Sequence, residues 1–162
     1  MIVHFSCGAA SAVSGIVAML RNPDKDIEFV YTDPGMEHKD NHRFMCDYES
    51  RLGIKVTKLK HTKYSNPFQI FKERRFLASP HGAPCTTELK KITARNYLGN
   101  RLLEEDNVFG FDCSKREKAR AKKYKENNPE LSTYFPLIEE GLEKSDCFYI
   151  PGHTWFVFTY DV

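Results

Sequence analysis

The sequence lacks a long hydrophobic run, a closely spaced cysteine pair and a strong net charge. No stretch of about twenty apolar residues occurs, so we expect no membrane span. The five cysteines are odd in number and far apart, without a CxxC pair. This argues against a closed zinc or iron–sulfur site and favours a reduced, cytoplasmic protein. The net charge of +2 gives no general argument for binding nucleic acid.

The composition is that of a globular chain long enough to bury a core. Of the 162 residues, 41% are hydrophobic and 28% are charged, which argues against general disorder. A strand pattern begins at Ile2 with no basic leader before it, so we expect no signal peptide. Lys and Arg are concentrated in Lys115–Lys125, where Glu117 is the one acid.

Short apolar runs alternate with amphipathic segments along the chain. The apolar runs predict strands at Ile2–Phe5, Ile27–Thr32, Lys55–Lys60 and Val108–Phe111. The amphipathic segments predict helices at Ala9–Leu20, Asp40–Leu52, Pro67–Phe76, Thr86–Leu103 and Lys115–Asn127. This alternation predicts a Rossmann-like, doubly wound α/β fold: a mostly parallel five-stranded sheet with helices on both faces.

Three polar turns are expected at the carboxyl ends of the strands, where doubly wound sheets bind ligands. They are Ser6–Ser11, Thr32–Glu37 and Gly110–Lys118. In the first turn, Ser6, Gly8 and Ser11 let the backbone pass close to a ligand. The helix that starts there offers unpaired N–H groups to an anion such as phosphate. The same small residues would also let the helix pack closely on the sheet.

Four segments of the chain carry a family resemblance. They are Ser6–Ser11; Tyr31–Glu37 with Arg43-Phe44 after it; Gly82–Lys90; and Val108–Phe111 with Glu117–Ala121 and Phe135–Ile138 after it. In this order they resemble the PP-loop, adenine-nucleotide α-hydrolase-like superfamily, and within it the phosphoadenosine-phosphosulfate (PAPS) reductase branch, especially small phage-type members. The resemblance covers residues 1–147, expected as one nucleotide-binding domain, and leaves 148–162 as a divergent aromatic tail.

The resemblance implies a site for an adenine nucleotide, namely PAPS, adenosine phosphosulfate (APS) or ATP, with Mg²⁺ left open and no iron–sulfur cluster. The residues it assigns to that site are Ser6, Cys7, Gly8, Ala9 and Ser11 for the phosphates, Thr32, Asp33 and Gly35 for the base, Lys90 and Arg120 for the distal anionic end, and Gly110 as a further nucleotide-binding residue. From the residues alone, Asp33-Pro34-Gly35 is also an ordinary turn. Lys90 and Arg120 are also ordinary solvated cations.

The chain departs from the S-G-G-x-D-S pattern of the ATP-cleaving members. Cys7 replaces the first glycine, and Ala10 replaces the aspartate that helps to manage Mg²⁺ and the scissile phosphates. Sulfonucleotide reductases lack that aspartate too, which favours sulfonucleotide reduction or nucleotide-dependent sulfur transfer. Their Glu-Cys-Gly-Leu-His-like tail has no match here, which favours a nucleotide-binding module without turnover, such as a sensor or a partner inhibitor. A third interpretation is tRNA or DNA thiolation, with Lys115–Lys125 against the phosphates.

Two cysteines are candidate catalytic nucleophiles or sulfur carriers. Cys85 precedes a predicted helix start, Thr86–Glu88, and Cys7 lies in the phosphate loop. The positive end of a helix dipole lowers the pKa of a thiol and favours the thiolate. Half-buried cysteines also serve as inert packing residues. In the catalytic interpretation, the partner would be a thiol reductant protein.

The tail Phe148–Val162 is aromatic and nearly uncharged. It predicts either a hairpin arm that turns at Pro151-Gly152 or a patch that a second copy or another protein covers.

His38 and His42 are the one histidine pair with a metal-ligand spacing, at i and i+4 beside Glu37. A polar helix face explains this pair better than a metal site does, so we expect no metal there.

Overall fold

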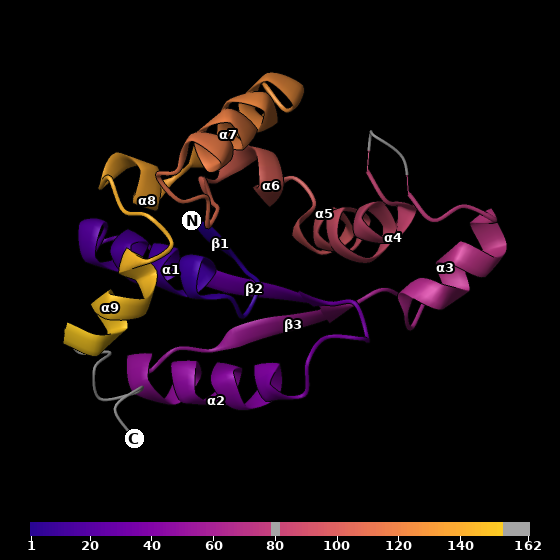
Figure 1. Cartoon of the computed structure of the whole chain (residues 1–162), viewed down its shortest axis with the longest axis horizontal. Coiled ribbons are helices and arrows are strands. Elements are labelled where there is room, and N and C mark those ends of the chain that lie inside the picture. The colour runs from indigo at the N-terminus through magenta and orange to yellow at the C-terminus, as the bar shows by residue number, and fades with distance from the viewer. Residues whose placement is uncertain (79–81, 154–162) are drawn as a thin grey trace.

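The computed structural model describes residues 1–78 and 82–153, which contain one sheet of five parallel strands. The strand order β3-β2-β1-β4-β5 places β1 at the centre. The strands are β1 (Ile2–Phe5), β2 (Glu28–Asp33), β3 (Val56–Lys60), β4 (Asn107–Val108) and β5 (Thr133–Tyr134). Helices lie on both faces of this sheet (Figure 1). The predicted Rossmann-like, doubly wound α/β fold is therefore confirmed.

The helices predicted at Ala9–Leu20, Asp40–Leu52 and Lys115–Asn127 are confirmed, whereas those predicted at Pro67–Phe76 and Thr86–Leu103 differ from the structure. The helices of the structure are α1 (Ala9–Arg21), α2 (Asp40–Leu52), α3 (Pro67–Arg74), α4 (Pro84–Thr86), the π-helix η1 (Thr87–Ile92), α5 (Thr93–Leu98), α6 (Arg101–Glu104), α7 (Lys115–Asn127), α8 (Pro136–Glu139) and α9 (Asp146–His153). The single helix predicted at Thr86–Leu103 is wrong, because the chain turns at Gly99, whose φ is +55°. The helix predicted to reach Phe76 ends at Arg74, because Arg75 adopts a left-handed backbone at φ 51°.

Strand boundaries differ most from the prediction at β4. The apolar run Val108–Phe111 predicts a strand, but the regular strand covers Asn107–Val108 only. Phe109 still donates its N–H to the carbonyl of Tyr134, and the chain then leaves the sheet. The run stays apolar beyond the strand because the rings of Phe109 and Phe111 pack against each other and against Phe135.

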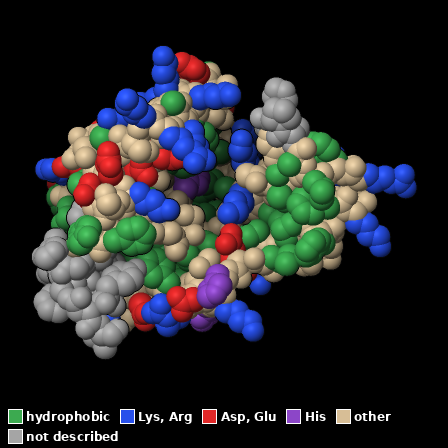
Figure 2. Space-filling view, in the orientation of Figure 1, with side chains coloured by type: hydrophobic (Ala, Val, Ile, Leu, Met, Phe, Trp, Pro, Cys, Tyr) green, Lys and Arg blue, Asp and Glu red, His purple; other side chains and the backbone are tan. Residues whose placement is uncertain are grey.

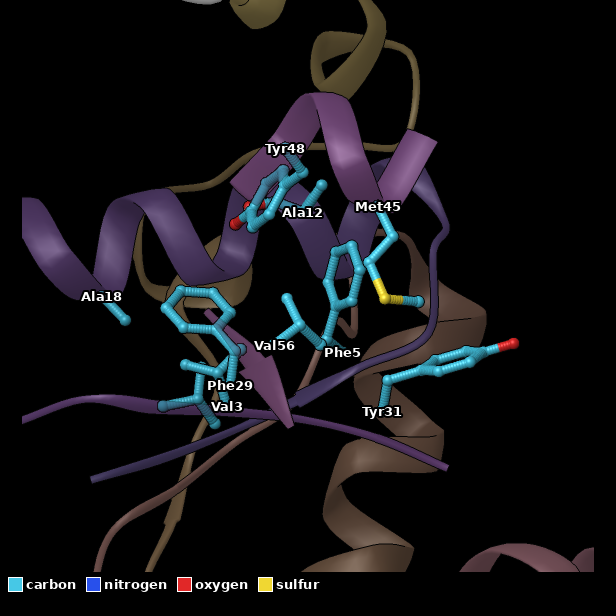
Figure 3. Packing of buried hydrophobic residues seen from close by; sticks show 10 residues of the cluster. Val3, Phe5, Ala12, Ala18, Phe29, Tyr31, Met45, Tyr48 and Val56 are labelled. Carbon is cyan, nitrogen blue, oxygen red and sulfur yellow. The ribbon is translucent and has the colours of Figure 1, made fainter. Parts of the chain in front are cut away.

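Alternate residues of the central strand face opposite helix layers. Val3 and Phe5 of β1 pack toward α1 and α2, in a core that includes Tyr48 (Figure 3). Ile2 faces the other layer and packs against α5 and α6. Because both faces are covered, apolar residues predominate in β1 and run consecutively over 29–31 in the middle of β2, as in other parallel sheets.

Helix α1 packs closely on the sheet because Gly15 has no side chain. A Cβ at this position would lie 2.4 Å from Phe29 Cε1 and 2.7 Å from Tyr48 Oη. The same Tyr48 hydroxyl donates a hydrogen bond of 2.8 Å to the carbonyl of Ala12. Gly15 therefore allows the close packing of α1 on the sheet, whereas a Cβ at Gly8 would meet only Ser6 Oγ, at 3.6 Å.

The C-terminal helix α9 packs against α1, where Cys147 contacts Val13 and Leu137. Pro151 and Gly152 lie within α9, so the hairpin turn predicted there is wrong. Helix α9 also spans the expected boundary between residues 147 and 148. Phe148 and Tyr149 are 63% and 66% exposed, and the partner patch stays a prediction. Residues 154–162 lie outside the described residues.

Within 1–78 and 82–153, none of the helices is both long enough and apolar enough to cross a bilayer.

Two glycines with similar backbone angles give a matched test of the fold. Gly35 has φ +77°, and a Cβ there would lie 1.8 Å from the carbonyl oxygen of Ser65. Gly53 has φ +64° with nothing within 4 Å. Left-handed backbone costs an alanine about 1–2 kcal/mol at either site, and displacing Ser65 adds about 1–3 kcal/mol. We expect Gly35→Ala to lower the free energy of unfolding more than Gly53→Ala does, as measured by urea denaturation. Equal losses would contradict the close approach.

Candidate functional site

A cavity of about 470 Å³ opens at the carboxyl ends of β1, β2 and β4. It lies between the sheet and the layer formed by η1, α5, α6 and α7. Figure 2 shows a hollow here, with hydrophobic and histidine side chains at its bottom and Lys and Arg side chains around it. Apolar side chains that line the cavity include those of Val30, Ile92, Leu102 and Leu131. The volume is in the range of pockets that hold small molecules and cofactors.

The hydroxyl of Ser11 holds the loop between β1 and α1. Its Oγ accepts hydrogen bonds from the backbone N–H and the hydroxyl of Ser6, at 3.1 Å and 3.0 Å. It also accepts from the N–H of Gly8 at 3.3 Å and donates to the carbonyl of Gly8 at 2.8 Å. Cys7 adopts a left-handed backbone, φ 57°, to close the loop. Ser6 lines the cavity, so this loop forms part of its wall.

The first turn of α1 begins at the same place. Its N-cap residue is Gly8, which has no capping side chain, and the turn contains no acidic residue. The first N–H groups of a helix have no partner within the helix. A Cβ at Gly110 would lie 2.7 Å from the backbone nitrogen of Ser11, so the third polar turn packs directly on this helix start. The first and third turns therefore meet, as expected.

The second polar turn contributes one residue to the cavity wall, Thr32. Asp33 and Gly35 instead form a tight turn beside it. The Asp33 carboxylate accepts the N–H of Gly35 at 2.8 Å and lies 3.4 Å from Lys60 Nζ. These contacts are those of the ordinary Asp-Pro-Gly turn, with Gly35 required by its positive φ.

The cations predicted from the sequence are paired with acids. Lys90 lines the cavity and donates to Glu37 at 3.2 Å. Arg120 lies outside the cavity lining, donates to Glu117 at 2.6 Å and stacks 5.1 Å from the ring centroid of Phe111. Both side chains would have to exchange a carboxylate for an anionic ligand. This weakens their assignment to the distal end of a nucleotide.

Two other cations line the cavity and have no carboxylate partner among the described residues. They are Lys91 and Arg95. Neither residue is a candidate from the sequence alone. The spacing of four residues between the two cations is the signal that could have found them, since it places them on one helix face. Arg95 also acts electrostatically on Tyr124 of α7, which lines the same cavity.

His4 of β1 is a cavity residue that the sequence analysis misses. Its ring stacks on Phe109 with centroids 4.5 Å apart and an angle of 3° between the rings. Phe109 is in turn 4.8 Å from the ring of Tyr124. Burial lowers the pKa of His4, although a hydrogen bond with Asn107 opposes the shift. The signal in the sequence is a single histidine inside a strand that is otherwise apolar.

The two candidate cysteines lie outside the cavity lining. Burial, followed by the charge of Glu37, raises the pKa of the Cys7 thiol to about 12. Cys7 is therefore protonated near neutral pH, despite its place beside a helix start. Cys85 lies in α4 and packs against Tyr64, Ile70 and Leu89. Such contacts are typical of a cysteine that serves packing.

Comparison of the sequence with protein-family models and with curated proteins gives no match. Within the described part of the chain, no group of three or more His, Cys, Asp or Glu side chains is arranged to hold a metal ion. His38 Nδ1 accepts the N–H of Asp40 at 3.2 Å, a contact within its own helix start.

Alkylation of the five thiols by iodoacetamide at neutral pH tests the raised pKa of the Cys7 thiol. We expect exposed Cys46 to react first. Cys7 should react at least about a hundredfold more slowly than in the urea-unfolded chain, because each unit of raised pKa lowers the thiolate fraction tenfold. Mass spectrometry of the peptides measures both rates. Labelling of Cys7 as rapid as that of Cys46 would contradict the raised pKa.

Proposed function

We propose that this chain binds an adenine nucleotide at the carboxyl edge of its sheet. The base would occupy the cavity, and the phosphates would lie at the Ser6–Ser11 loop. The observation that carries the proposal is continuity: an apolar cavity shares its wall with a loop that leads into the start of α1, whose N-cap residue Gly8 has no capping side chain. A base needs the first environment, and a phosphate needs the second. The resemblance to PP-loop proteins supports the same assignment.

The charges around the cavity support an anionic ligand. Among the residues that the structure describes, Lys91 and Arg95 have no carboxylate partner, and Lys90 forms an ion pair with Glu37. A cation without a partner at a cavity mouth attracts an anion without first losing an internal ion pair. PAPS, APS and ATP all carry negative charge beyond the first phosphate, so each is a candidate ligand.

The proposal favours a module that binds its nucleotide without thiol chemistry. Sulfonucleotide reduction or sulfur transfer needs a thiolate near the ligand. The raised pKa of Cys7 and the packing of Cys85 both oppose that role. If a cysteine does react, Cys7→Ser combined with Cys85→Ser abolishes turnover. If the chain only binds, the double variant keeps the affinity of the parent.

Isothermal titration with AMP, ATP, APS, PAPS and adenosine 3′,5′-bisphosphate, with and without Mg²⁺, tests the proposal. We expect binding of at least one of them. Arg95→Ala and Lys91→Ala should each weaken it about tenfold or more, because a hydrogen bond to a charged group contributes about 1.5–3 kcal/mol.

Lys123→Ala is the matched control, since Lys123 is an exposed cation of α7 outside the cavity lining. It should leave the affinity unchanged. An equal loss in the Lys123 variant would point to general charge attraction, and no binding of any nucleotide would sink the proposal.

A further inference from the structure

His4 lies deep in the fold and still has accessible surface. Strand β1 is central in the sheet, and His4 falls on the same face as Ile2, toward α5, α6 and α7. Its ring is half-buried and lines the cavity, with one side covered by Phe109. A side chain that lies on the central strand and is still accessible to solvent forms part of the floor of a cavity. The floor of this cavity therefore carries a hydrogen-bonding ring.

Asn107 fixes which nitrogen of His4 carries the proton. Its Nδ2 donates to three backbone carbonyls, those of Leu102 at 2.8 Å, Glu105 at 2.9 Å and Ser132 at 3.3 Å. The amide is thus held with Oδ1 toward His4, 2.9 Å from Nε2. A carbonyl oxygen can only accept, so Nε2 must be the donor. Asn107 is fully buried, and its orientation is therefore fixed by the fold.

The other ring nitrogen of His4, Nδ1, is left as an acceptor. Burial lowers the pKa of the ring, so it is neutral at physiological pH and holds one proton, on Nε2. Nδ1 has no hydrogen-bond partner among the described residues. Among those residues, the side-chain atoms that are both sealed from solvent and unpartnered belong to Ser14 and Thr133. Nδ1 is accordingly reachable, and the cavity is the space that the His4 side chain lines.

We propose that His4 Nδ1 accepts a hydrogen bond from the exocyclic amino group of the bound base, and that His4 thereby selects 6-aminopurines over purines without that group. This inference rests on the proposed function and names the residue that makes the site specific. A purine with a 6-oxo group would place the lone pairs of that oxygen against the lone pair of Nδ1. A purine with only a hydrogen at position 6 would exclude water from Nδ1 without giving it a hydrogen bond. Asn107 is the positioning residue, because it acts through His4.

Titration calorimetry with three ligands and two proteins tests the inference. The ligands are AMP, IMP and purine riboside 5′-monophosphate, which lacks the amino group. Wild-type protein should bind AMP about tenfold or more tightly than either analogue. His4→Phe keeps an aromatic ring against Phe109 and removes the acceptor. It should bind the three ligands equally, and it should bind the purine riboside nucleotide no more weakly than the wild-type protein does, because the unpaired acceptor is gone.

The outcomes separate the inference from the proposed function. Binding of none of the three ligands by the wild-type protein overturns both. Equal binding of AMP and the purine riboside nucleotide by the wild-type protein overturns the inference alone, as does a preference that persists in His4→Phe.

A spectroscopic readout needs no variant, in case His4→Phe fails to fold. The ¹⁵N resonance of His4 Nδ1 should be that of an unprotonated nitrogen in the free protein. It should move on addition of AMP more than on addition of the purine riboside nucleotide. Equal movement with both ligands, or a protonated Nδ1 in the free protein, would overturn the inference.

Discussion

Burial of β1 on both faces is the constraint on which the rest of the structure depends. A central strand between β2 and β4 must send alternate side chains into two helix layers. Val3 and Phe5 pack in the core beside α1 and α2. His4 lies between them in the strand, so its side chain faces the other helix layer. The same strand ends at Ser6 and delivers the chain to the start of α1. One short element thereby positions the cavity floor and the loop beside it.

The helix layer over the cavity depends on the irregular segment η1. A π-helix has a wider turn than an α-helix and recurs at functional sites. Here three consecutive residues of η1, Lys90, Lys91 and Ile92, line the cavity, and α5 adds Arg95. The pairing of Lys90 with Glu37 also ties this layer to the turn after β2. The ion pair between Lys90 and Glu37 is therefore both a charge interaction at the cavity mouth and a structural link between the helix layer and the turn after β2.

Periodicity in the sequence was sufficient for the long elements and the fold class, because burial of two faces leaves a clear apolar pattern. It was insufficient for β5, whose two residues, Thr133 and Tyr134, are too few to show alternation. The role of each site residue depends on its contacts with other elements, and the pattern of residue types in the sequence does not show these contacts. The ion pairs of Lys90 and Arg120 join them to acids on their own or another element, and these pairs decide which cations are free for a ligand.

The central claim is that a nucleotide binds at the carboxyl edge of the sheet, and backbone amide NMR with AMP tests it most directly. The account predicts chemical-shift changes at Ser6–Ser11, Thr32 and Arg95. The opposite edge provides an internal control, because a charged depression there is lined by Lys25, Lys55 and other polar residues. Shifts confined to that opposite edge, or no shifts at millimolar AMP, would contradict the account.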